Sequence, residues 1–207
     1  MDTVDLIALT LGVSWASGIN LYAAMLALGW MGSTGQVDLP PGLEILANPM
    51  VMKAAGAMYF VEFFADKIPG VDTDWGTLQT FVRIPAGAML AAGAAGDMDI
   101  GQAGELAAMI LGGSLSAATH ATKMGTRAVV NTSPEPFSNW TLSISEDIAV
   151  IGGMWAALNH PVLFIIALIA FIALMICLSH KIWRGIKAIA RKIASWFGRK
   201  EPTTSSE

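Results

Sequence analysis

The sequence predicts an all-α integral membrane protein with five to six transmembrane or re-entrant helices. Of its 207 residues, 54% are hydrophobic and only 14% are charged, and the mean hydropathy is +0.57. Soluble domains typically carry about a quarter charged residues, so this composition argues against one. The stretch 160–180, HPVLFIIALIAFIALMICLSH, has no internal charge and reaches the roughly 20 residues that cross a bilayer.

The first hydrophobic segment, residues 4–31, is expected to be retained. Asp2 and Asp5 flank it without any basic residue, whereas a secretory signal needs a basic start and a small-residue cleavage site. In its middle, GVSWASGIN brings serine, glycine and Asn20 into the apolar run, which predicts an interruption. The single cysteine, Cys177, lies in an apolar span, so no intrachain disulfide is expected.

Two further apolar segments follow in the first half of the chain. Residues 32–49 predict a proline-containing loop with a short interfacial helix, and residues 50–70 predict a second helix that ends in charged residues. The stretch 71–97 is apolar but contains Arg83 and Pro85, which predict a break or a sharp bend. It is either one kinked crossing or a re-entrant hairpin.

The second half begins with a helix predicted over 101–130, followed by an irregular connection over 131–140. The next helix is predicted over 143–161, with Glu146 and Asp147 in its first turn, where acidic side chains favour the helix dipole. Pro161 then separates this helix from the apolar span.

The chain changes character after residue 178. Seven of its twelve Lys and Arg residues lie between 181 and 200, and isoleucine and tryptophan recur there at steps of three and four. This pattern predicts a basic amphipathic helix over 179–200 that lies in the membrane interface and binds anionic headgroups. A disordered tail is predicted over 201–207. The positive charge predicts a cytoplasmic C-terminus.

The predicted membrane domain, residues 1–178, contains a weak internal repeat of 7–97 and 107–178. LGVSWASGINLYAA aligns with LGGSLSAATHATKM, and AGAMYF aligns with IGGMWA. Three segments in each half would make the halves inverted in the membrane. Inverted repeats with broken helices are a transporter architecture, with the site near the bilayer midplane.

A stripe of polar side chains marks the helix predicted over 101–130. At steps of four, three and four, the stripe consists of Ser116, His120, Lys123 and Arg127. Beside it, at steps of four, runs a ridge of small residues, which predicts close helix contact: Gly113, Ala117, Ala121 and Gly125. Lys123 and Arg127 either extend to lipid headgroups or form an anion or phosphate pocket.

Carboxylates cluster at the end of the second apolar segment. Glu62 and Asp66 share a helix face, and Asp72 follows in the sequence. They are partners of the basic residues, hydrated helix ends, or a cation or proton site. Glu135, between two prolines, belongs to a stiff polar loop that is either aqueous or lines a cavity.

The phrases ASGINLYAAML, VEFFADKIPGVD, FVRIPAGAML and THATKMGTRAVVNTSPEPFSN resemble an uncharacterised bacterial family of multi-pass membrane proteins, the domain of unknown function four-one-two-six. The resemblance covers roughly residues 5–178. It implies a small multi-pass protein of the bacterial cytoplasmic (inner) membrane, and it marks the polar motifs as characteristic of the family without assigning them an activity.

The leading hypothesis is transport or flipping of a polar or anionic, including lipid-linked, solute. The expected solute-binding residues are Asn20, Arg83, Ser116, His120, Lys123 and Arg127. The expected charge-balancing or proton- or cation-binding residues are Glu62, Asp66, Asp72 and Glu135. The alternatives are a structural or accessory subunit and, less favoured, an intramembrane lipid-modifying enzyme. No catalytic motif, cofactor, metal site or nucleic-acid partner is expected. The expected partners are membrane lipids, and the chain is expected to form a homo-oligomer.

Overall fold

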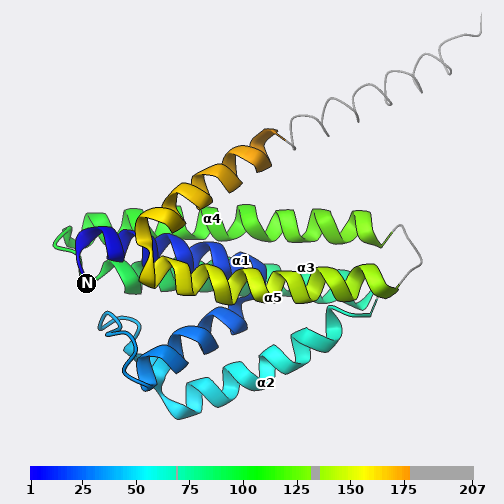
Figure 1. The fold of residues 1–207 in the computed structure, drawn as a ribbon, viewed down its shortest axis with the longest axis horizontal. Coiled ribbons are helices and arrows are strands. Elements are labelled where there is room, and N and C mark those ends of the chain that lie inside the picture. The colour runs from blue at the N-terminus through cyan, green and yellow to red at the C-terminus, as the bar shows by residue number, and fades with distance from the viewer. Residues whose placement is uncertain (69, 132–135, 178–207) are drawn as a thin grey trace, which may run out of the picture. The chain divides into compact units, whose positions relative to one another are not determined.

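The computed structural model describes residues 1–68, 70–131 and 136–177, and within these ranges every regular element is a helix. The all-α prediction is therefore confirmed. The elements are α1 (Thr3–Ser33), the short 3-10 helix η1 (Glu44–Ala47), α2 (Pro49–Ala65), α3 (Val71–Ala95), α4 (Gly101–Val130), α5 (Pro136–Asn159) and a last helix, Pro161–Cys177 (Figure 1). The predicted interfacial helix 179–200 and tail 201–207 lie outside the described residues.

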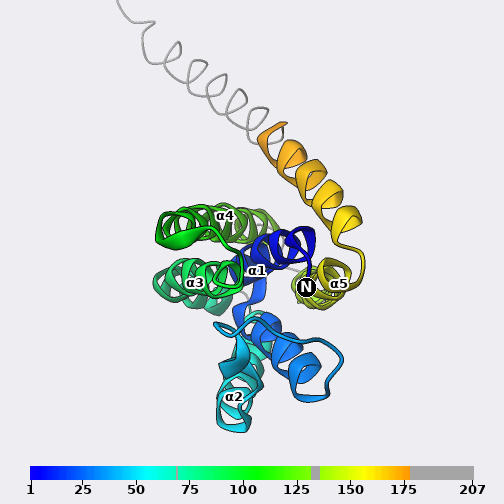
Figure 2. The ribbon, with the colours of Figure 1, turned by 90° about the vertical axis from the view of Figure 1, so that its left-hand side faces the viewer.

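The chain divides into two compact units, residues 1–166 and 167–207. In the first unit, α1 is the central helix and packs against α2, α3, α4 and α5. Figure 2 shows α3 and α4 side by side on one flank of α1 and α5 on the other. The buried core follows from this arrangement, because its apolar side chains come mainly from α1: Leu9, Val13, Ala16, Ala24 and Leu28, with Val150 and Met154 from α5.

Helix α1 is interrupted at Asn20, as the polar residues in its middle predicted. The backbone of Asn20 is extended (φ −148°, ψ 94°), and the two halves of α1 diverge there (Figures 1 and 2). The Asn20 side chain accepts the N–H of Ala23 at 3.0 Å. It thus acts as an N-cap for the second half, which satisfies one of the amides that a new helix start leaves free.

Very close contacts hold α1, α3 and α4 together. A Cβ atom on Gly18 would collide with the Thr119 side chain and the Ser116 carbonyl, and one on Gly87 would lie 2.6 Å from Ser116 Cβ. The predicted small-residue ridge of α4 makes this contact only at its start. Gly113 is buried, and a Cβ atom there would lie 3.2 Å from Ala88 Cβ of α3, whereas Ala121 and Gly125 are exposed. The tightest contact of α4 with α3 is made by Gly112, where a Cβ atom would collide with Ala91.

Two predicted helix boundaries are also corrected. Helix α3 continues through Pro85, so the chain does not break there. Pro85 is exposed while Arg83 and Gly87 are buried. The backbone hydrogen bond that proline cannot donate is therefore missing on the outer side of the helix. Helix α5 begins at Pro136 rather than near Ser143, since proline suits the first turn of a helix.

In the part of the chain that the structure describes, two helices are long and apolar enough to cross a membrane: α1 and Phe137–Asn159 of α5. The helix Pro161–Cys177 is apolar but shorter. Most of the charged side chains described below belong to α2, α3 and α4, and Glu146 and Asp147 belong to α5.

Candidate functional site

A buried ion-pair network lies where α2, α3, α4 and α5 meet the break of α1. We use this name for seven side chains: Glu62, Asp66, Asp72, Arg83, Lys123, Arg127 and Glu146. All are buried except Glu146, whose side chain is 11% exposed. Charges are rarely buried unless they are paired, and here the three cations and four carboxylates pair with one another.

Lys123 is at the centre of the network. Its ammonium lies 2.8 Å from Asp66 Oδ2, and 3.2 Å from both Glu62 Oε1 and Glu146 Oε2. Glu62 also pairs with Arg83. One lysine of α4 therefore joins carboxylates at the end of α2 to a carboxylate of α5.

Arg127, one turn further along α4, contacts three carboxylates. Its Nη2 donates to Glu146 Oε2 at 2.7 Å and to Asp66 Oδ2 at 3.0 Å, and its Nη1 lies 3.8 Å from Asp72 Oδ2. Its Nη1 also donates to the backbone carbonyl of Asp66. The fork of the guanidinium suits it to several oxygen acceptors at once.

The break in α1 supplies two further acceptors to these cations. Arg83 Nη1 donates to the carbonyls of Gly18 (3.0 Å) and Ile19, and Lys123 Nζ donates to the Ile19 carbonyl at 2.9 Å. Carbonyls just before a break lack the amide partner of a continuous helix. In this protein the cations of α3 and α4 take the place of that partner, so the broken helix and the network stabilise each other.

Asp147, next to Glu146, has a different environment. Its Oδ1 accepts from Asn20 Nδ2 at 2.8 Å, and its Oδ2 accepts from the Tyr59 hydroxyl at 2.9 Å. Among the described residues, no Lys or Arg nitrogen lies within 4.0 Å of it. We call Asn20, Tyr59 and Asp147 the Asp147 cluster; it ties the break of α1 to α2 and α5 through neutral donors.

Lys67, which follows α2, lies against the face of α5 that carries Ser143 and Asp147. Its ammonium donates to the Phe63 carbonyl at 3.0 Å and to Ser143 Oγ at 3.3 Å, and it lies over the Phe63 ring. Burial lowers the pKa of Lys67, while the nearby Asp147 and Asp66 carboxylates oppose this effect. With Lys67 and Asp147 added to the network, five carboxylates face four cations, which leaves one negative charge in excess.

The other predicted site residues have mainly supporting contacts. Ser116 Oγ donates to the Arg83 carbonyl at 2.9 Å. His120 Nε2 lies 2.8 Å from Thr80 Oγ1 and 3.1 Å from the Gly76 carbonyl, so both residues join α4 to α3.

At the far end of the site, Asn131 Nδ2 donates to Asp72 Oδ2 at 2.9 Å. Glu135 lies outside the described residues. Within the described ranges no group of three or more His, Cys, Asp or Glu side chains is placed to hold a metal ion.

The sequence interpretation missed Tyr59, Glu146 and Asp147 as site residues. Because α5 begins at Pro136, the two acids lie about three turns inside the helix, not in its first turn. One signal was available, because the buried face of α5 recurs at steps of three and four: Asn139, Ser143, Asp147, Val150, Met154 and Ala157. Its first three members, Asn139, Ser143 and Asp147, are polar, and they mark the part of α5 that faces the ion-pair network.

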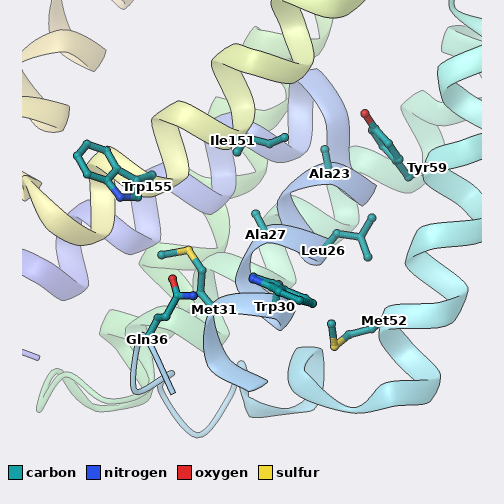
Figure 3. A pocket seen from close by; sticks show the side chains of 10 residues that line it. All are labelled: Ala23, Leu26, Ala27, Trp30, Met31, Gln36, Met52, Tyr59, Ile151 and Trp155. Atoms are coloured by element: carbon teal, nitrogen blue, oxygen red, sulfur yellow. The ribbon is translucent and has the colours of Figure 1, made fainter. Parts of the chain in front are cut away.

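An apolar pocket of about 430 Å³ adjoins the Asp147 cluster (Figure 3). It lies between the second half of α1, α2 and α5, and its lining includes Ala23, Trp30, Met52, Tyr59, Ile151 and Trp155. Tyr59 thus belongs both to the pocket wall and to the Asp147 cluster.

The network itself is not part of this pocket, since none of its seven side chains belongs to the lining. The volume lies within the range of small-molecule sites, about 300–1,000 Å³.

The comparisons with known proteins agree with the resemblance in the sequence. Residues 7–181 match the model of one protein family, the domain of unknown function DUF4126. No curated protein and no solved structure matches the chain. The matched segment contains the break of α1, the whole ion-pair network and the Asp147 cluster, and it covers most of the chain; the protein therefore belongs to the DUF4126 family.

Proposed function

We propose that this protein is a multi-pass integral protein of the bacterial cytoplasmic membrane, with a cytoplasmic C-terminus, that transports or flips a polar or anionic, including lipid-linked, solute. The observation that carries the proposal is the break of α1 at a buried ion-pair network. Transporters bind solutes where a membrane helix is broken, because unwound backbone is tolerated at membrane depth only inside protein or beside a cavity. The apolar helices α1 and α5 support the membrane location.

The solute would bind by exchange, because the basic residues already have partners. An anionic group would replace Glu146, which shares Lys123 and Arg127. Glu146 is the most exposed carboxylate of the network. It belongs to α5, which packs on α1 but makes few contacts with α4. Glu146 can therefore leave Lys123 and Arg127 at lower cost than the carboxylates at the end of α2.

Mass spectrometry of molecules that co-purify with the protein tests this exchange. Glu146→Gln removes the competing charge while it preserves side-chain size, so we expect this variant to retain more of an anionic lipid or solute than the wild type. Glu105→Gln, on the exposed surface of α4, is the matched control. Equal retention by Glu146→Gln, Glu105→Gln and the wild type would argue against the exchange.

The second candidate function is that of a structural or accessory membrane subunit. It is favoured by the ion pairs that Arg83, Lys123 and Arg127 each form with at least one carboxylate of the described residues. A chain of this size is in either case expected to form a homo-oligomer. Purification as a stable complex with a larger membrane protein, with no anionic molecule retained, would support this candidate over transport.

A further inference from the structure

We propose that Asp147 is a proton-binding site, reached through the apolar pocket, whose occupancy controls the break of α1. In the proposed transport, the proton on Asp147 would be the coupling ion, and this role alone rests on the proposed function. The first observation is the contrast with the other carboxylates. Glu62, Asp66, Asp72 and Glu146 each have a Lys or Arg nitrogen within 4.0 Å. The side-chain donors that Asp147 receives from the described residues are two neutral ones, Asn20 and Tyr59.

The surrounding charges favour uptake of one positive charge. The charged groups that act on Asp147 are Glu62 from α2, Lys67 after α2 and Lys123 from α4, with Glu146 adjacent on α5. Lys123 is already shared by three carboxylates, and Lys67 donates to neutral oxygens. A proton on Asp147 would remove the one excess negative charge of the site.

The ligands around Asp147 suit a proton better than a metal cation. A bound cation such as Na⁺ or Ca²⁺ needs several oxygen atoms directed at it, but the neighbours of Asp147 direct an N–H and an O–H toward its oxygens. The Asn20 carbonyl oxygen is already engaged by the Ala23 amide. The Tyr59 hydroxyl, however, can accept a hydrogen bond as well as donate one, so it can remain the partner of a protonated Asp147.

Upon protonation, a proton from the pocket side would bind to Asp147 Oδ2, and the new O–H would donate to the Tyr59 oxygen. The Tyr59 hydroxyl hydrogen would turn away from Asp147, toward the pocket that Tyr59 lines. No other bond changes, and Asn20 Nδ2 still donates to Oδ1.

Asn20 connects this proton to the shape of α1. Its amide nitrogen donates to Asp147 while its amide oxygen caps the second half of the helix. A hydrogen bond to a carboxylate is roughly twice as strong as one to a neutral group. Neutral Asp147 therefore holds Asn20, and with it the break, less firmly than charged Asp147 does.

The test measures protonation directly and requires no solute. Infrared difference spectra of the protein in lipid bilayers, recorded against pH, report the C=O band of a carboxylic acid. Hydrogen–deuterium exchange of the amides at 17–24 reports the break. Besides the titration of the exposed carboxylates, we expect the wild type to show one protonation step that is accompanied by faster exchange at the break. Asp147→Asn should lack the step and exchange fast at every pH, whereas Asp99→Asn, an exposed control, should behave like the wild type.

Tyr59→Phe gives a second, independent result. It removes a donor that stabilises the carboxylate, so the midpoint should move to higher pH by about one unit. The proposal is overturned if Asp147→Asn retains the step that accompanies faster exchange at the break, if Tyr59→Phe leaves its midpoint in place, or if the step follows Na⁺ concentration instead of pH. If Asp147→Asn does not fold, the Tyr59→Phe midpoint decides. A proton step without anion exchange at Glu146 would contradict the transport proposal and leave this site standing.

Discussion

Among the substitutions considered in the ion-pair network, Glu62→Gln is expected to lower the stability of the protein most. Glu62 is fully buried and is the one carboxylate of the described residues that pairs with Arg83. The variant leaves Arg83 buried without a carboxylate, so that its acceptors are the carbonyls of Gly18 and Ile19 and the neutral amide oxygen of the new side chain. Removing one partner of a buried ion pair typically costs about 3–5 kcal/mol. Since glutamine keeps one acceptor oxygen, we expect a loss near the lower end of that range, about 3 kcal/mol.

The expected loss of stability in Glu62→Gln is compared with the losses in two other variants. In Glu146→Gln, Lys123 and Arg127 both keep Asp66 as a partner, so the loss should be about 1 kcal/mol, typical of one hydrogen bond. Glu105→Gln on the exposed surface should change stability by less than about 0.5 kcal/mol. The assay is reversible unfolding in mixed micelles against increasing denaturing detergent. The pairing assigned to Arg83 is refuted if Glu62→Gln is no more destabilising than Glu105→Gln.

Two further predictions concern the packing around the site. Gly18→Ala places a methyl group against Thr119 and the Ser116 carbonyl, and overpacking of this kind should cost about 3 kcal/mol; Gly125→Ala enters open space and should stabilise α4 by about 0.5–1 kcal/mol. Opposite signs are expected in thermal unfolding, and equal effects would contradict the close contact. Asp72→Ala removes the acceptor of the Thr73 and Gly70 amides and of Asn131, which should lower stability by about 2 kcal/mol. Its neighbour Asp74 is exposed, so Asp74→Ala in the same assay should cost much less, and an equal loss would contradict the capping role of Asp72.

The sequence predicted the helices that have one strong periodic signal. Helix α4 has the predicted bounds, 101–130, because a long apolar run passes into a regular polar stripe without a proline. The stripe residues Lys123 and Arg127 meet Glu62 and Asp66, the pairing that charge complementarity favoured. Spacing along one helix shows which side chains share a face, but it does not show which neighbouring helix covers that face.

Three features were not accessible from the sequence for identifiable reasons. Small residues occur on two faces of α4, so their spacing alone did not select Gly112 over Gly125 as a contact residue. Residue 136 falls within the irregular connection predicted over 131–140. The sequence therefore predicts Asp147 in the first turn of a helix, whereas in the structure it lies in a buried turn further inside α5. Tyr59 is one of several aromatic residues in α2, and only its hydroxyl contact with Asp147 distinguishes it. The internal repeat of 7–97 and 107–178 stays a prediction.

Anion exchange at Glu146 is the central claim of the proposed function, and thermal unfolding with added inorganic phosphate tests it most directly. Phosphate that binds only the folded protein raises its stability with concentration. In Glu146→Gln, Lys123 and Arg127 lose a competing carboxylate, so phosphate should raise the unfolding temperature of this variant more than that of the wild type. Chloride at equal ionic strength controls for screening. Equal phosphate shifts in Glu146→Gln, Glu105→Gln and the wild type would contradict the account.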